Sequence, residues 1–90
     1  MAALRAAVAE REAAATRLEG ETEELDKDQQ RLRDNLQAVG QGSDIGRRYM
    51  VKLGEQEDRL EKLGKDLTEA RAAVETARAA LAEYVKGVKF

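Results

Sequence analysis

The sequence predicts an all-α protein: an antiparallel two-helix coiled-coil hairpin that turns back near the middle of the chain. Three observations support this fold class. The 90 residues include no proline, and 38% are charged while only 3% are aromatic, which is typical of long helices and coiled coils. Apolar residues recur in alternating steps of three and four. A glycine-rich segment, GQGSDIG at residues 40–46, divides this pattern in two.

The first apolar series predicts a helix over residues 2–39. Its residues occupy the positions that face a partner helix in a heptad repeat. They are Leu4, Val8, Arg11, Ala15, Leu18, Thr22, Leu25, Gln29, Leu32, Leu36 and Val39.

The glycine-rich segment predicts a turn over residues 40–43. Gly40 is placed to end the first helix in the left-handed conformation, and Ser43 or Asp44 is placed to cap the next helix. A dinucleotide-binding loop is not expected, because such a loop follows a β-strand and these glycines follow a helix.

The second apolar series predicts a helix over residues 44–86 and matches the first when facing residue numbers add up to 85. Leucine then faces leucine, as in Leu32 with Leu53, and alanine faces alanine, as in Ala15 with Ala70. The series consists of Tyr49, Leu53, Gln56, Leu60, Leu63, Leu67, Ala70, Val74, Ala77, Leu81, Tyr84 and Val88.

The same register places Gln29 opposite Gln56, and we expect these buried amides to hydrogen-bond to each other and to set the register of the helices. Charged residues beside the two series should also complement each other, with one exception, Glu21 beside Asp66. The expected pairs are Glu12 with Arg78, Glu19 with Arg71, Arg33 with Glu57, and Asp28 with Arg59.

Several functional classes are excluded or disfavoured by composition. The chain has no cysteine and no histidine, so we expect no thiolate or histidine metal site, no cysteine nucleophile and no cofactor. No window approaches the roughly 18 apolar residues of a membrane span. Carboxylate neighbours such as Glu23 and Glu24 lack the shielded pocket that acid–base catalysis needs, so an enzyme is not expected.

Positive charge is concentrated around the predicted turn. Residues 31–52 carry 5 positive and 2 negative charges, whereas residues 1–30 carry 4 and 8. Arg47, Arg48 and Lys52 are therefore candidates to contact an anionic partner, whether phosphate, nucleic acid or an acidic protein surface. A solvated turn is the favoured alternative, and nucleic acid is not expected, because three or four cations form a weak footprint.

Two groups of residues are candidate contacts with a protein partner. Alanines replace charged residues along one flank of both helices, which predicts that a helix from a second copy or from the parent protein covers this side, pairing the hairpin into a four-helix bundle. The alternative is that alanine is present only for its helix propensity. A second group lies off the main series near the turn, where local packing is the alternative. The candidates are Ala7, Ala14, Ala73 and Ala80 on the flank, and Ile45, Met50 and Val51 near the turn.

The segments QQRLRDNLQAV and GSDIGRRYMVKLGEQEDRLEKL resemble the C-terminal coiled-coil region of mucoidy-inhibitor-A-like bacterial proteins, a family of unknown function with a β-rich main domain. The resemblance implies that this chain is a fragment, a structural appendage of a larger bacterial protein. The sequence departs from the family pattern at Gly46, where a bulky residue is expected. The matching residues are Arg31, Arg33, Asn35, Leu36, Ser43, Asp44, Ile45, Arg48, Tyr49, Lys52, Leu53, Gln56 and Glu57.

The sequence therefore predicts a non-catalytic structural or interaction module, which acts as a spacer, scaffold or oligomerisation arm. Self-association as a homodimer, or a protein partner, is expected, and a small-molecule substrate is not. The alternative function is a binding arm whose basic turn contacts nucleic acid or another anionic partner.

Overall fold

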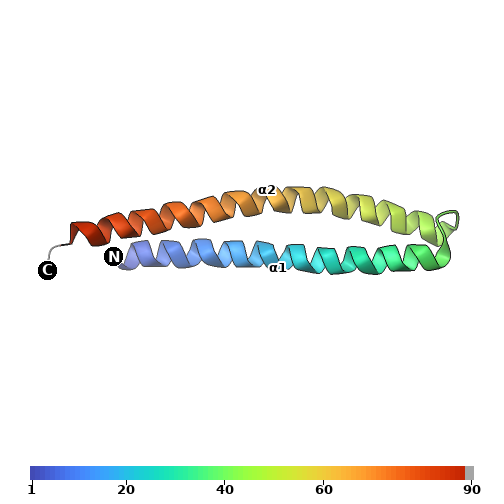
Figure 1. Ribbon diagram of the computed structural model, residues 1–90, viewed down its shortest axis with the longest axis horizontal. Coiled ribbons are helices and arrows are strands. Elements are labelled where there is room, and N and C mark those ends of the chain that lie inside the picture. The colour runs from blue at the N-terminus through green and yellow to red at the C-terminus, as the bar shows by residue number, and fades with distance from the viewer. Residues whose placement is uncertain (89–90) are drawn as a thin grey trace. The chain divides into compact units, whose positions relative to one another are not determined.

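The structure, a computed structural model, describes residues 1–88, and these residues contain two α-helices. α1 spans Ala2–Val39 and α2 spans Asp44–Gly87, and residues 40–43 join them (Figure 1). The helices divide into two compact units, each of which pairs a part of α1 with a part of α2. We call residues 20–64 the turn unit, and residues 1–19 with 65–88 the terminal unit. In each unit the two helices are antiparallel, which confirms the predicted fold class.

The core of the turn unit is a single row of layers between the helices. Leu32 and Leu63 are its fully buried side chains, 1% and 0% exposed, and Gln29 and Gln56 are buried beside them. These positions follow the heptad spacing on both helices, since residues three and four apart share one helix face. Two helices cannot enclose every layer, so Val39 is exposed and other members of the row stay half-buried. The half-buried members are Thr22, Leu25, Leu36, Tyr49, Leu53 and Leu60.

The terminal unit has a thinner core built from smaller residues. Ala15 and Val74 are its buried side chains, each 7% exposed. Arg11 and Tyr84 occupy positions in the apolar series but are exposed, so the series does not bury all of its members. The half-buried members are Leu4, Val8, Leu18, Leu67, Ala70, Ala77, Leu81 and Val88.

The turn uses both capping devices expected from its sequence. Gly40 has a positive φ of 83°, and its N–H donates to the carbonyl oxygen of Leu36 at 2.8 Å, which ends α1. Ser43 caps α2, because its Oγ accepts the backbone N–H of Gly46 at 2.9 Å. The same hydroxyl donates to the carbonyl oxygen of Gly40 at 2.9 Å and so ties the two helix ends together.

Gly46 is buried where the two helix ends approach most closely. A Cβ at this position would overlap the carbonyl oxygen of Gly40 and would lie 2.9 Å from the Oγ of Ser43. The bulky residue that the family pattern led us to expect at position 46 therefore has no room, and glycine is required by the close approach.

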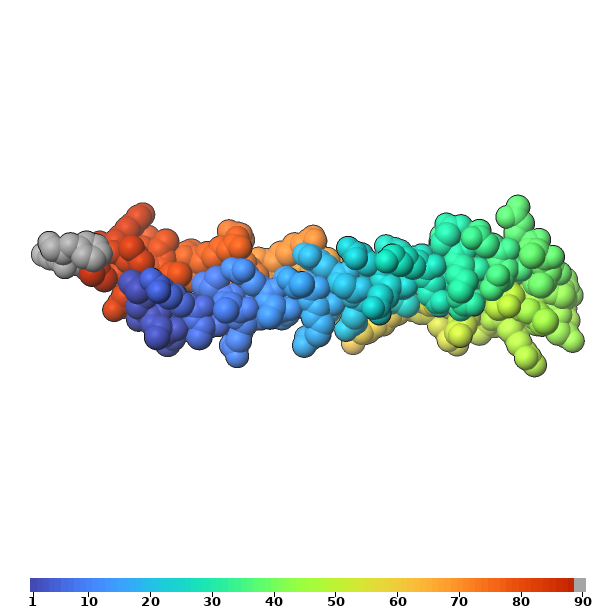
Figure 2. Space-filling view, turned by 90° about the horizontal axis from the view of Figure 1, so that it is seen from below, coloured from blue at the N-terminus to red at the C-terminus, as the bar shows by residue number. Residues whose placement is uncertain are grey.

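In the turn unit, the green side chains of α1 lie directly against the yellow-green side chains of α2 in the space-filling view (Figure 2). Among the residues that the structure describes, neither helix has a stretch long and apolar enough to cross a membrane.

Candidate interaction surfaces

The buried glutamine layer in the turn unit differs from the expected arrangement. Gln29 Nε2 donates to Glu57 Oε1 at 3.0 Å, and Gln56 Nε2 donates to Asp28 Oδ2 at 2.5 Å. The expected bond between the two glutamines is therefore wrong. Each amide instead reaches the carboxylate beside the opposite glutamine, because a charged carboxylate is a stronger acceptor than an amide oxygen.

The two glutamine oxygens have different surroundings. Oε1 of Gln29 accepts a hydrogen bond from Arg33 Nη2 at 3.2 Å. Oε1 of Gln56 is buried without any hydrogen-bond partner, which is costly for a polar atom. That Gln29 and Gln56 set the register of the helices stays a prediction. They would do so through their hydrogen bonds to Glu57 and Asp28 on the opposite helix.

Asp28 is the titratable group whose environment is most clearly changed by the fold. Hydrogen bonds from Arg31 and from Gln56 hold the pKa of this carboxyl below its ordinary value, and the positive charge of Lys52 acts in the same direction. Arg31 is one turn away on the same helix, with Nη2 at 2.9 Å from Oδ1 of Asp28. Asp28 therefore stays ionised while it accepts from the buried amide of Gln56.

Three of the four expected ion pairs across the helices are present. Arg33 lies 3.7 Å from Glu57, Arg71 lies 3.4 Å from Glu19, and Arg78 lies 3.4 Å from Glu12. All of these side chains are about half exposed, so each pair contributes only about 0.2–1 kcal/mol to stability.

The expected pair between Asp28 and Arg59 is wrong. Arg59 Nη2 contacts Glu21 Oε2 at 2.8 Å instead, about two helical turns along α1 from Asp28. Asp28 is already occupied by Arg31 and Gln56. This arrangement also accounts for Glu21, which the register alone left beside a like charge.

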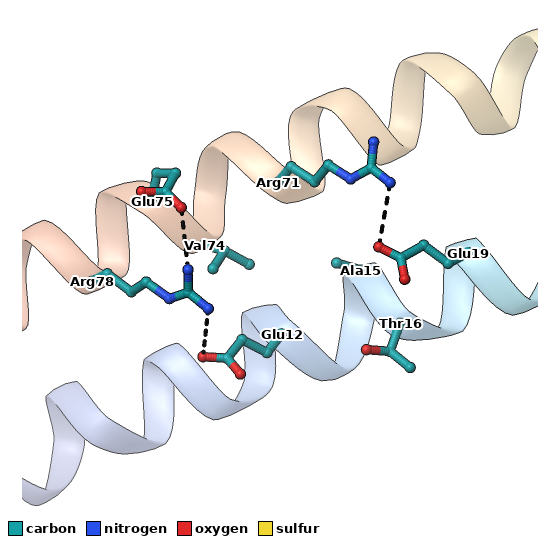
Figure 3. Close-up of a pocket in the computed structure, with 8 residues that line it drawn as sticks. All are labelled: Glu12, Ala15, Thr16, Glu19, Arg71, Val74, Glu75 and Arg78. Atoms are coloured by element: carbon teal, nitrogen blue, oxygen red, sulfur yellow. Dashed lines mark hydrogen bonds and ion pairs between the residues drawn. The ribbon is translucent and has the colours of Figure 1, made fainter.

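A shallow groove crosses the terminal unit above the buried side chains of Ala15 and Val74. In Figure 3, Arg71 and Arg78 reach from α2 across the groove toward glutamates of α1, on either side of these two side chains. Arg78 also contacts Glu75 one turn away on its own helix, at 3.3 Å. The groove is open to solvent, and its charged side chains are satisfied by one another. Within residues 1–88, no cluster of acidic residues is arranged to hold a metal ion.

The alanine flank belongs entirely to the terminal unit. Ala7, Ala14 and Ala73 are half-buried, and Ala80 is exposed. Because these side chains are small, the outer side of each remains in contact with solvent within the described chain. They stay candidate partner contacts.

The apolar residues near the turn are strongly exposed. Ile45 is 51%, Met50 46% and Val51 63% exposed. Local packing under the turn, which is the alternative, therefore covers only about half or less of the surface of each side chain. The three residues stay candidate partner contacts.

The basic candidates surround Val51. An open depression on the surface of α2 is lined by Arg47, Arg48, Val51, Lys52 and Glu55. Arg47 is paired with Asp44 at 2.5 Å, so part of the expected positive charge is neutralised locally. Arg48 and Lys52 form no ion pair with any residue that the structure describes.

Sequence reasoning missed a second depression, on α1 of the turn unit. It is lined by Glu21, Glu24, Leu25, Asp28 and Arg59. The signal was present in the sequence, because Glu21, Glu24 and Asp28 follow the spacing of one helix face.

These features define the class of the molecule: an antiparallel pair of long helices that carries open depressions and exposed apolar residues. None of the protein-family models, curated proteins or solved structures compared with this chain matches it.

Proposed function

We propose that this chain is a non-catalytic interaction module that serves as a spacer, scaffold or oligomerisation arm of a larger protein. The observation that carries the proposal is the exposure of large apolar side chains on both helices, from Val39 and Ile45 at the turn to Tyr84 and Val85 near the end of α2. A single exposed apolar residue is ordinary, and we take the repeated exposure of large apolar side chains along the two helices as the sign of a contact surface.

The thin core supports the same proposal. Only Leu32 and Leu63 among the leucines of the two series are fully buried. Full burial of a leucine side chain contributes about 1.5–3 kcal/mol to stability, and a half-buried leucine gains only part of this. A partner helix against the open side of these layers would bury the remainder. Small folds usually gain stability from such added contacts.

The resemblance to mucoidy-inhibitor-A-like proteins is consistent with this role, since it implies a structural appendage of a larger protein and brings no established activity with it. We therefore propose that the chain extends from a larger bacterial protein and positions or joins other parts of an assembly.

The experiment that tests the proposal is site-specific photo-cross-linking in cells, in the complete protein that contains this chain. A photoreactive residue at Val51 or at Ala14 should yield discrete adducts of defined mass. The same residue at Asp58 or at Lys62, both exposed and outside the candidate surfaces, should not. Adducts that are absent everywhere, or equal at all four positions, would remove the interaction role.

A second candidate function is a binding arm whose basic turn holds an anionic partner. The observation that favours it is the absence of an ion pair at Arg48 and Lys52 within the described residues. Binding to single-stranded nucleic acid or polyphosphate should then weaken with salt and should be lost in Arg47→Gln/Arg48→Gln/Lys52→Gln. Binding that is undetectable even at low salt would eliminate this alternative.

A further inference from the structure

The open depression on α2 in the turn unit combines an exposed apolar side chain with positive charge. Its lining residues are three and four positions apart along the helix and therefore share one side of it. They are Arg47, Arg48, Val51, Lys52 and Glu55. From the first to the last of these residues the surface extends about 12 Å along α2, at 1.5 Å per residue. We call it the basic depression.

The basic depression faces away from α1. Val51 is two residues from both Tyr49 and Leu53, which are half-buried members of the row between the helices. Two residues rotate an α-helix by about 200°, so Val51 points to the opposite side of α2. It is 63% exposed, more than any other large apolar residue that the structure describes. Because α1 lies on the other side of α2, burial of Val51 requires a partner.

The basic depression carries more positive charge than its surroundings neutralise. Arg47 is paired with Asp44, at 2.5 Å. Arg48 and Lys52 are exposed and form no ion pair with any residue that the structure describes. Glu55, at the end of the depression farther from the turn, is also exposed and unpaired among the described residues. A partner therefore meets two unpaired cations and, beyond them, one carboxylate.

These charges disfavour several occupants. Two copies of this chain joined by a twofold axis through the depression would bring both Arg48 and both Lys52 side chains together, with only two Glu55 carboxylates to oppose them. For nucleic acid, the lining offers no aromatic side chain on which a base could stack, and Glu55 repels a continuous phosphate backbone. A membrane surface requires a broader apolar face than one valine.

We propose that the basic depression binds an acidic helical segment of another protein. An apolar residue of that segment covers Val51, and carboxylates one turn away from it pair with Arg48 and Lys52. A helix suits an exposed helical surface of this length, as in other complexes in which an amphipathic helix lies along its partner. The inference rests on the proposed interaction role and specifies one surface and the chemistry of its partner.

The test compares the binding of two labelled peptides to the whole chain by fluorescence anisotropy. The first is an acidic peptide of about 20 residues, with leucine at every third or fourth position and glutamate or alanine elsewhere. The second has glutamine in place of each leucine and therefore the same charge and a similar helix propensity. The first peptide should bind about fivefold more tightly than the second, and its binding should weaken as salt increases.

Variants of the chain separate the contributions of charge and of apolar contact. Arg48→Gln/Lys52→Gln should weaken binding of the first peptide about fivefold, because two ion pairs are lost. Val51→Ser should weaken it by a similar factor and should bring the affinities of the two peptides together. Glu55→Gln should strengthen binding about twofold, since it removes a like charge. A gain in affinity cannot result from damage to the fold.

Lys27→Gln/Lys62→Gln is the matched control. Both lysines are exposed in the turn unit and lie outside the basic depression, so this variant removes the same charge from the same unit. It should leave binding of the first peptide close to that of the wild-type chain. Circular dichroism verifies that every variant remains helical.

Three results would overturn the inference. Equal binding of the two peptides by the wild-type chain would show that the depression responds to charge alone. Single-stranded DNA, or vesicles that contain phosphatidylserine, binding as tightly as the first peptide would assign the surface to another class of partner. A first peptide that does not bind at low salt would remove the site, whereas photo-cross-linked adducts from Ala14 in cells would still support the interaction role.

Discussion

Gln56 donates its side-chain amide to Asp28 across the turn unit at 2.5 Å, while its own carbonyl oxygen is buried without a partner. A buried amide that is only partly satisfied lowers stability, whereas an apolar residue of similar shape in its place often raises it. The glutamine layer is thus expected to reduce the free energy of unfolding in return for a defined register.

The double variant Gln29→Leu/Gln56→Leu should increase the free energy of unfolding by about 1–2 kcal/mol in urea titrations. It should also broaden the distance distribution between spin labels at Lys27 and Asp58, two exposed positions of the turn unit. Gln37→Leu, at an exposed position of α1, should change neither quantity. A double variant that retains one narrow distance would show that the leucine layers suffice to set the register.

The leucine layers could be predicted from the sequence, whereas the polar contacts could not. The heptad spacing places Leu32 and Leu63 between the helices because burial of apolar area depends on helix face alone. Which acceptor the amide of Gln56 contacts depends instead on how far flexible side chains reach within one helical turn. Arg59 pairs with Glu21 for the same reason. Heptad spacing places the layers, but it does not predict which of several nearby carboxylates a side chain contacts.

The candidate surfaces were predicted in part for a similar reason. The apolar residues near the turn could be predicted as candidate contacts because they fall outside the apolar series that lies between the helices, as Val51 does. The depression around Leu25 required the three-dimensional neighbourhood of α2, since Arg59 forms one of its sides. Sequence spacing showed the carboxylates but not the hollow between them.

Leu63→Ala should lower the free energy of unfolding by about 2–3 kcal/mol, because it removes a fully buried side chain and leaves a cavity. Leu53→Ala, the same change at a half-buried layer of the same helix, should cost about half as much. Urea unfolding followed by circular dichroism measures both. Equal losses at the two positions would contradict the different burial of these leucines.

Gly46→Ala and Gly54→Ala should have opposite effects although both lie in α2. An alanine at position 46 overlaps the carbonyl oxygen of Gly40, so we expect a loss of about 1–3 kcal/mol in the free energy of unfolding. Apart from the chain neighbours and the adjacent backbone of α2, no atom lies within 4 Å of a Cβ at position 54, so the better helix propensity of alanine should add about 0.5–1 kcal/mol. Thermal and urea unfolding of the two variants would reveal the difference in sign.

The carboxyl of Asp28 should make stability depend on pH. Its pKa in the folded chain is lowered from the ordinary value of 3.8 by hydrogen bonds from Arg31 and Gln56. The unfolded chain therefore takes up the proton first as the pH falls, so the stabilisation is complete well above pH 3.8 and is lost as the pH falls through the lowered value. The difference in unfolding free energy between wild type and Asp28→Asn should shrink over this range.

Gln37→Leu, at an exposed position of α1, is a suitable control for the pH experiment, because it changes no titratable group. Its difference from wild type should stay constant over the same pH range. A difference for Asp28→Asn that stays constant from neutral to acidic pH would contradict the role of the ionised carboxylate.

The hydrogen bonds that join Gly40, Ser43 and Gly46 imply that the number of residues in the turn determines how the two helices are aligned. One residue added to or removed from this segment would displace one helix by about 1.5 Å and rotate it by about 100° relative to its neighbour. Leucines would then move out of the core between the helices, and charged residues would move into it, throughout the turn unit. Evolution can therefore change the outer surface of this molecule one residue at a time, while insertions and deletions between its helices carry a penalty that extends far beyond the loop.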